Sequence, residues 1–381
     1  MIRQNFIQMI VEGFSVHPII AILGPRQSGK TTLTRQYIDI VKEKKQIHYF
    51  DLEDPNDLAA LKSPKAILEN LEGLIVIDEI QRIKELFPVL RVLIDKGNSK
   101  QQYLILGSAS QELIKQSSET LAGRIEYIEL PPFQYNETQN LERLWIRGGF
   151  PRSFLSANDN SSYRWRESYI RTFLERDIPN LGIKIPAENI RRFWMMLSNN
   201  HGGILNASDL GKSLYISHTT VRHYLDILVG TFMVRQLYPW FENISKRQIK
   251  SPKIYIRDSG ILHSLLQIRT NSDLFNHLKL GASWEGFALE EIIKHHNFRS
   301  QECYFWSTQN KAEIDLFTIN HGKRIAYEFK FTDSPKITKS MRIAIEDLKL
   351  DVIYVLYPGN KKYQIEDKII FCGLQNYLNF Y

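Results

Sequence analysis

One octapeptide limits what this chain can fold into more than any other stretch. Residues 24–31 read GPRQSGKT, with two glycines and a Lys-Thr pair at the spacing G-x-x-x-x-G-K-[ST]. The apolar run Ile19–Leu23 precedes it and predicts a buried strand, and Thr32–Ile38 predicts the start of a helix. This strand–loop–helix order is that of a P-loop, whose backbone N–H groups and helix N-terminus surround a phosphate.

The residues of the loop and the first residue after it are predicted to contact a nucleotide. They are Gly24, Pro25, Arg26, Gln27, Ser28, Gly29, Lys30, Thr31 and Thr32. Lys30 is expected to reach the β- and γ-phosphates, and Thr31 to ligate Mg²⁺. ATP and Mg²⁺ are therefore the expected cofactors. The alternative is a chance glycine-rich turn.

Further apolar runs follow at the spacing of a parallel α/β sheet. They cover Ile47–Phe50, Gly73–Ile77 and Gln102–Leu106, with helical-looking stretches between them. Runs of β-branched residues and leucine suit parallel strands that are covered on both faces. The sequence therefore predicts an α/β domain that binds its ligand at the carboxyl ends of the strands.

Polar residues at two of these strand ends are candidates for catalysis. Asp78 and Glu79 end the third strand in the Walker B arrangement, with Asp78 expected in the Mg²⁺ shell and Glu79 expected to polarise the attacking water. Ser108 follows the fourth strand and is expected to sense the γ-phosphate or position that water. The alternatives are two solvated turn carboxylates and a serine that only caps a helix.

Size and composition predict several domains in a cytoplasmic protein. A chain of 381 residues exceeds one typical core, and we expect domains at 1–160, 161–280 and 281–381. Two cysteines, Cys303 and Cys372, make no disulfide framework. No apolar stretch reaches the length of a bilayer span, so no membrane contact is expected.

The excess positive charge lies in the middle of the chain. Residues 161–280 hold 17 Lys and Arg against 9 Asp and Glu, whereas the flanking regions are nearly balanced. Concentrated positive charge is typical of a contact with DNA or RNA. A well-solvated surface is the alternative.

A helix-turn-helix pattern occupies part of this basic region. Residues 206–214 predict a first helix, and Ser217 is a good N-cap for a second helix over 218–229. The second helix has apolar positions at helical spacing: Val221, Leu225 and Leu228. A strand predicted at 231–237 makes this a winged-helix segment.

The other face of the second helix carries polar residues that suit DNA. Arg222 can read guanine, while His218 and Thr219 can touch phosphate. Four basic residues that can hold the nucleic-acid backbone follow: Lys246, Arg247, Lys250 and Lys253. A lid or interaction module without DNA contact is the alternative.

The motifs together resemble a bacterial and archaeal family of AAA-type ATPases. The resemblance rests first on Gly24–Thr31, Leu74–Gln81 and Leu106–Ser110. It extends to four further segments: Leu121–Arg124, Gly148–Pro151, Glu175–Ile178 and Lys253–Gly260. In that family a C-terminal region of unknown function follows the nucleotide domain.

An ATPase of this kind also needs a cation for the charge that develops during phosphoryl transfer. Arg124 and Arg176 are the candidates in this sequence. Arg176 can instead pair with its neighbour Asp177. If either arginine acts in trans, the protein must form a homo-oligomer.

The C-terminal region contains a predicted β-hairpin with charged residues on adjacent strands. Its strands cover Glu313–Thr318 and Arg324–Lys330, with a turn at Asn320–Gly322. Glu328 and Lys330 share one face because they lie two residues apart, and Asp315 lies on the neighbouring strand.

Asp plus Glu-x-Lys across a hairpin resembles the core of the PD-(D/E)xK nuclease fold. The resemblance implies a small α/β nuclease-like domain in which Asp315 and Glu328 bind Mg²⁺ and Lys330 positions water. Glu285 is the candidate carboxylate from the helix Trp284–His295, since it projects from the apolar arc and Glu290 points the other way. A charge-paired hairpin or a degenerate nuclease fold is the alternative.

The predicted function is ATP binding and hydrolysis coupled to nucleic-acid binding or processing. One alternative is a regulatory NTPase switch whose C-terminal domains bind protein partners without nuclease activity. A catalytically silent binding module is another.

Overall fold

The computed structural model divides the chain into two compact units. It describes residues 1–381 except 84, 97–99, 109–119, 242–249, 309–311 and 381. Ser110, Lys246 and Arg247, named above, lie outside the described residues. The first unit is Met1–Pro132 with Gly230–Phe232, and the second is Phe133–Val229 with Met233–Tyr381.

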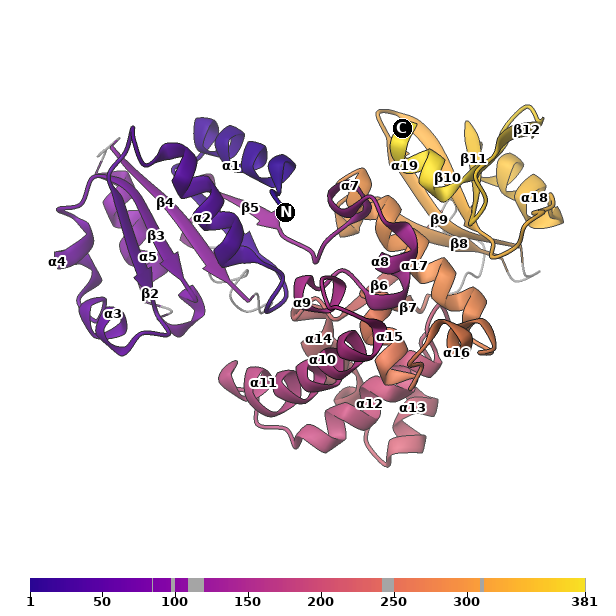
Figure 1. Ribbon diagram of the computed structural model, residues 1–381, viewed down its shortest axis with the longest axis horizontal. Coiled ribbons are helices and arrows are strands. Elements are labelled where there is room, and N and C mark those ends of the chain that lie inside the picture. The colour runs from indigo at the N-terminus through magenta and orange to yellow at the C-terminus, as the bar shows by residue number, and fades with distance from the viewer. Residues whose placement is uncertain (84, 97–99, 109–119, 242–249, 309–311, 381) are drawn as a thin grey trace. The chain divides into compact units, whose positions relative to one another are not determined.

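The first unit is built on a five-stranded parallel sheet (Figure 1). Its strand order is β2-β3-β4-β1-β5, with β1 (Ile19–Leu23), β2 (Ile47–Asp51), β3 (Gly73–Asp78), β4 (Gln101–Gly107) and β5 (Ile125–Glu129). The described helices are α1 (Gln4–Val16), α2 (Lys30–Val41), α3 (Pro55–Ala60), α4 (Pro64–Leu68) and α5 (Leu86–Asp95). The prediction of a parallel α/β domain is confirmed.

Helices cover both faces of this sheet, which explains the continuous apolar runs. All five residues of β1 are buried. Ile20 and Ile22 pack in the core that contains α1 and α2. Ala21 and Leu23 pack in the opposite core, which contains α5. Because side chains alternate along a strand, both sets of positions must be apolar.

Helices dominate the N-terminal part of the second unit (Figure 1). They are α7 (Tyr135–Thr138), α8 (Leu141–Arg147), α9 (Pro151–Phe154), α10 (Asp159–Thr172), α11 (Ile178–Asn180), α12 (Ala187–Asn199), α13 (Ala207–Leu214), α14 (His218–Gly230), α15 (Ser259–Leu265) and α16 (Asn271–Phe275). Across the ranges that the structure describes, no helix has both the length and the hydropathy to cross a membrane.

The two predicted helices at 206–229 are confirmed as α13 and α14. Ser217 caps α14, since its hydroxyl accepts a hydrogen bond from the backbone N–H of Thr220 at 3.1 Å. The predicted apolar positions are buried: Val221, Leu225 and Leu228. The strand that follows, β6 (Val234–Pro239), starts three residues later than predicted and pairs antiparallel with β7 (Lys253–Ile256).

An eight-stranded mixed sheet forms the rest of the second unit. Its order is β12-β13-β11-β10-β9-β8-β6-β7, with β8 (Cys303–Ser307), β9 (Glu313–Asn320), β10 (Lys323–Phe329), β11 (Val352–Tyr357), β12 (Lys362–Glu366) and β13 (Ile369–Gly373). Strands β9 and β10 form the predicted antiparallel hairpin, in which Tyr327 lies opposite Leu316. The helices α17 (Leu280–His295) and α19 (Leu374–Phe380) pack on one face, and α18 (Lys339–Asp347) packs on the other.

Packing places residues 133–160 with the second unit rather than with the five-stranded sheet of the first. Phe133, Trp145 and Phe154 share a core with Trp284 and Phe287 of α17. Aromatic side chains of this size contribute most of the buried area of a small core. The three-domain division of the chain at 160 and 280 stays a prediction.

Candidate functional site

The predicted nucleotide residues gather at one edge of the first sheet. Leu23 at the end of β1 lies opposite Gly107 at the end of β4, and Asp51 lies opposite Asp78. The carboxyl ends of these strands are therefore level. The loop 24–31 leaves β1 there, beside Asp78 and Ser108.

The loop between β1 and α2 has the backbone of a phosphate cradle. Gln27 and Gly29 have left-handed φ values of 64° and 99°. Gly24 is needed for a close approach, since a Cβ there would collide with the carbonyl oxygen of Leu130. The buried Ser28 hydroxyl has no hydrogen-bond partner in the described part of the chain. Such an orphaned buried hydroxyl fits a loop whose missing partner is an anionic ligand.

The ammonium of Lys30 lies inside this loop. It donates hydrogen bonds to the carbonyl oxygens of Gly24 and Pro25, each at 3.0 Å. Only 7% of Lys30 is exposed. A buried cation at the helix N-terminus is well placed for phosphate.

Two residues that were predicted to contact nucleotide lie further out. Arg26 Nη2 is 2.7 Å from Glu53 Oε1, and Arg82 Nη2 is 3.9 Å from the same oxygen. Thr32 is exposed in the first turn of α2. Their contact with nucleotide stays a prediction.

A hydroxyl and a carboxylate meet where Mg²⁺ is expected. The Thr31 hydroxyl donates to Asp78 Oδ2 at 3.0 Å, and the Tyr49 hydroxyl donates to the same oxygen at 2.9 Å. The other oxygen, Oδ1, accepts from the backbone N–H of Glu79 at 2.9 Å. Oxygen ligands of this type suit Mg²⁺, which keeps several waters and binds through one or two protein groups and the phosphates.

Gln81, which was not singled out from the sequence, links the two candidate water-positioning residues. Its Nε2 donates to the carboxylate of Glu79 and to Ser108 Oγ, the latter at 3.1 Å. Burial raises the pKa of Glu79, while Lys30 opposes the shift. A carboxylate with a raised pKa is a better proton acceptor near neutral pH.

Arg3 supports the loop from the side of α1. It is 3% exposed, and its guanidinium donates to the carbonyl oxygen of Ser28 at 3.1 Å and to that of Pro131 at 3.0 Å. Its Cζ is 4.7 Å from the centroid of the Phe6 ring. No local pattern in the sequence predicts this role of Arg3, because its two partners lie 25 and 128 residues away in the chain.

The arginine candidate Arg124 lies at the end of the sheet where the strands begin, away from the carboxyl ends that carry the loop 24–31. It directly precedes β5, whose first residue pairs with the first residue of β1. Its Nε is 2.6 Å from Asp95 Oδ1. Arg124 therefore cannot reach the loop 24–31 of its own chain, and only action in trans stays a prediction.

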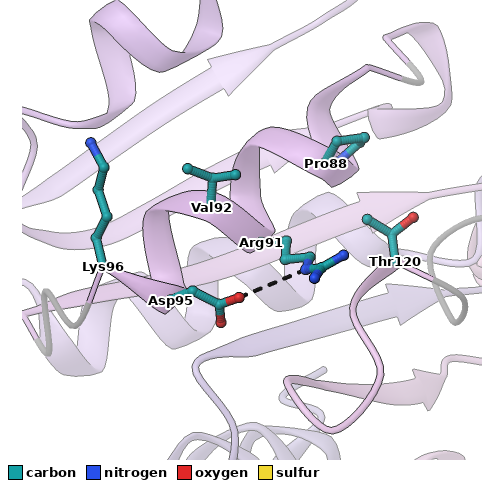
Figure 2. A pocket seen from close by; sticks show the side chains of 6 residues that line it. All are labelled: Pro88, Arg91, Val92, Asp95, Lys96 and Thr120. Atoms are coloured by element: carbon teal, nitrogen blue, oxygen red, sulfur yellow. Dashed lines mark ion pairs between the residues drawn. The ribbon is translucent and has the colours of Figure 1, made fainter.

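Figure 2 shows a pocket at α5 that includes Asp95. It is lined by Pro88, Arg91, Val92, Asp95, Lys96 and Thr120. Arg91 Nε is 3.7 Å from Asp95 Oδ2, so Asp95 forms ion pairs with both Arg91 and Arg124. This pocket is separate from the loop 24–31.

The other arginine candidate, Arg176, lies in a π-helical turn, Phe173–Asp177, of the second unit.

The four nuclease-like candidates converge in the second unit. Glu285 comes from α17, Asp315 from β9, Glu328 from β10, and Lys330 directly follows β10. Lys330 Nζ is 2.6 Å from Glu328 Oε2 and 3.7 Å from Asp315 Oδ2. The latter oxygen also accepts from the backbone N–H of Phe329 at 3.0 Å.

Strand β7 adds two residues that were not expected in this cluster. Lys253 Nζ lies 3.7 Å from Glu285 Oε1 and 3.8 Å from Asp315 Oδ1, and it also contacts Glu313. The Tyr255 hydroxyl donates to Glu285 Oε1 at 2.7 Å. The prediction that Lys253 binds a nucleic-acid backbone is wrong, because its side chain is 5% exposed and surrounded by carboxylates.

The carboxylates of this cluster suit Mg²⁺ chemically, but their arrangement does not. Burial, reinforced by the charge of Asp315, raises the pKa of Glu285 to about 7 and that of Glu328 to about 8. Within the ranges described, no three His, Cys, Asp or Glu side chains are placed to hold a metal ion. Among the residues that the structure describes, Lys253 and Lys330 are the cations that face these carboxylates.

Glu290 differs from the expectation that it points away from the core. It is 1% exposed, accepts a hydrogen bond from Arg235 Nη2 at 3.0 Å, and lies 3.5 Å from Arg257 Nε. The helical wheel was misleading here because α17 is covered almost all round, with every residue from Gly286 to Ile293 buried.

The predicted nucleic-acid face of α14 is open to solvent. His218, Thr219 and Arg222 are exposed, while Tyr224 on the other side is buried. Asp226 is also exposed on this helix and reduces its positive charge.

Sequence comparisons divide the chain into three matched regions. Residues 16–139 match the AAA domain, residues 138–272 match Domain of unknown function (DUF8612), and residues 280–377 match Domain of unknown function (DUF4143). Uncharacterized proteins of Mycobacterium tuberculosis and Mycobacterium bovis are each 45% identical over 355 residues, which is 93% of this chain and 79% of theirs. Among solved structures, a Walker-type ATPase of Pyrococcus abyssi covers 69% of this chain and 95% of its own, with 15% identity and a TM-score of 0.43.

Proposed function

This chain belongs to the family of the uncharacterized mycobacterial proteins and has a P-loop ATPase domain of the AAA type, and on this premise we propose that it hydrolyses ATP at residues 24–31. One observation carries the proposal. The hydroxyl of Thr31 and the carboxylate of Asp78 are in contact beside the buried ammonium of Lys30. Phosphate-binding and metal-binding groups thus meet at one point.

The residues divide the work of the reaction among them. Lys30 and the loop N–H groups bind the phosphates, and Thr31 and Asp78 would hold Mg²⁺. When bound, Mg²⁺ neutralises charge on the β- and γ-phosphates. Glu79 orients the attacking water and accepts its proton, and Ser108 fixes the position of that water.

Replacing Glu79 with glutamine is expected to leave ATP bound but unhydrolysed. The amide keeps the shape of the side chain but cannot accept a proton, so kcat should fall by about 100-fold or more. Phosphate release measures turnover, and a fluorescent ATP analogue measures binding. Glu85→Gln, at an exposed glutamate six residues further on, is the matched control and should match the wild type. Normal turnover of the Glu79→Gln variant would refute the role of Glu79.

We also propose that ATP turnover is coupled to nucleic acid through residues 161–280. The exposed polar face of α14 and the excess of basic residues in this range support it. Turnover of the wild type is therefore measured with and without single- and double-stranded DNA and RNA at low salt. Stimulation by one of them favours coupling. No stimulation by any favours the alternative, a regulatory switch that binds protein partners.

Phosphodiester cleavage by the second unit is a second candidate function. It is supported by the convergence of Glu285, Asp315, Glu328 and Lys330 from separate elements. These residues match the nuclease-like pattern in type, and Lys330 is the more open of the two lysines, with 37% of its side chain exposed. A substrate phosphate can therefore reach Lys330.

Asp315→Asn is expected to abolish this cleavage. Asp315 contacts both lysines and the Phe329 N–H, so its charge organises the whole cluster, and a loss of about 100-fold or more is expected. Degradation of labelled DNA and RNA is followed with millimolar Mg²⁺ or Mn²⁺. Asp333→Asn, at an exposed position three residues beyond Lys330, should cleave like the wild type. If the wild type degrades none of the substrates, this candidate function fails.

A further inference from the structure

The carboxylate cluster of the second unit contains a lysine that no nuclease-like motif requires. Lys253 lies at the start of β7, the edge strand of the eight-stranded sheet, opposite Leu237 of β6. It is remote in sequence from Glu285 and Asp315, and it reaches them only through the fold. Its side chain is 5% exposed.

Three carboxylates surround the ammonium of Lys253. Glu285 Oε1 is 3.7 Å from Nζ, Asp315 Oδ1 is 3.8 Å away, and Glu313 is in direct contact. The Phe305 ring covers another side, with its centroid 5.6 Å from Nζ. An ammonium has three N–H donors, and a buried one is stable only when acceptors surround it.

The two lysines of the cluster have different exposures. Lys330 Nζ bonds Glu328 and lies near Asp315 Oδ2, with more than a third of its side chain open to solvent. Lys253 faces Asp315 Oδ1 and is enclosed. A substrate can touch Lys330 but not Lys253, so the role of Lys253 concerns the carboxylates themselves.

A divalent ion and this ammonium need the same oxygens. Mg²⁺ and similar ions bind carboxylate oxygens at about 2.0–2.6 Å. An ion bound to both Glu285 Oε1 and Asp315 Oδ1 would sit beside the Lys253 ammonium, where two cations repel each other strongly at low dielectric. In the described ranges, no three carboxylates of the cluster are placed to hold such an ion.

We propose that Lys253 is the resident cation of this carboxylate cluster, and that a divalent metal ion enters between Glu285 and Asp315 only by displacing it. This inference rests on the proposed cleavage of phosphodiesters by the second unit and concerns how that site would bind metal. Its test uses neither ATP nor nucleic acid, so it can succeed or fail independently of both proposed activities.

The test measures Mn²⁺ binding to the full chain without nucleotide, by the EPR signal of unbound Mn²⁺. Lys253→Met keeps the length of the side chain and removes its charge, and it should lower the Kd for Mn²⁺ about tenfold or more. The added change Asp315→Asn should remove the gain, which locates the ion in the cluster. Lys323→Met, at an exposed lysine at the start of β10, should bind Mn²⁺ like the wild type. Equal Mn²⁺ affinity of the wild type and Lys253→Met would overturn the proposal.

A second measurement uses the wild type, in case Lys253→Met does not fold. An amine-acetylating reagent followed by mass spectrometry reports which lysines are accessible. Lys253 should be protected without metal and acetylated at saturating Mn²⁺, while Lys323 should react equally in both conditions. Asp315-dependent Mn²⁺ binding that leaves Lys253 protected would show that the ion does not displace it, and the proposal would be wrong.

Discussion

Lys30→Ala is expected to reduce ATP hydrolysis by about 100-fold or more, and to weaken nucleotide binding with it. The ammonium of Lys30 is buried inside the loop and already bonds two of its carbonyl oxygens. Alanine removes the charge that faces the phosphates and also the contacts that hold the loop closed. Phosphate release over a range of ATP concentrations gives kcat and KM, and a fluorescent ATP analogue gives the Kd.

A matched lysine in the same helix segment controls for charge alone. Lys42 directly follows α2, pairs with Asp39 at the surface, and has 55% of its side chain exposed. Lys42→Ala should therefore hydrolyse ATP like the wild type. If Lys30→Ala keeps its turnover, residues 24–31 are not the hydrolytic site. If it loses turnover while Glu79→Gln does not, the loop is right and the assignment of Glu79 is wrong.

Glu290→Gln is expected to cause the largest loss of stability of any single exchange considered. The carboxylate is 1% exposed and lies between Arg235 and Arg257, so the exchange removes a buried negative charge that both guanidinium groups face. Breaking a buried ion pair from one side costs about 3–5 kcal/mol, and Tm should fall by roughly 10 °C. Differential scanning calorimetry measures it.

A surface pair provides the control. Arg342 Nη2 lies 2.6 Å from Glu366 Oε1, with 62% and 37% of the two side chains exposed. Arg342→Ala should leave Tm unchanged, because solvent and salt screen such a pair. A Tm for Glu290→Gln within one or two degrees of the wild type would contradict the assigned role of Glu290.

The contribution of Glu290 also depends on pH in a defined direction. Burial alone would raise its pKa, but Arg235 and Arg257 together lower it to about 2. An unfolded glutamate titrates near about 4.3. The stabilisation is therefore complete above that value and is lost as the pH falls toward 2. The difference in Tm between wild type and Glu290→Gln should shrink over this range.

The parts that could be predicted from the sequence are those encoded in short segments. The strand Ile19–Leu23 is apolar at every position because it is covered on both faces, and such a run is visible without the structure. The hairpin of β9 and β10 follows from alternation and a turn signal. Parallel order then aligns the strand ends, which brings Asp78 to Thr31.

The parts that could not be predicted depend on contacts between distant segments. Arg3 supports the loop through residues far along the chain, and Lys253 meets its carboxylates only because β6 brings β7 to the edge of the sheet. Glu290 was misjudged for a related reason. A helical wheel assumes one solvent-facing side, and α17 has almost none.

The strand order of the first sheet also has a consequence for folding during synthesis on the ribosome. Strand β1 is the first strand to be synthesised, yet its two neighbours are β4 and β5, which end at Gly107 and Glu129. About a third of the chain must therefore be synthesised before β1, which leads into the loop 24–31, can pair on both sides. Non-local pairing of this kind is slow and leaves apolar strands exposed meanwhile. A nascent chain that stops before β5 would leave one edge of β1 unpaired and its apolar residues open to wrong contacts.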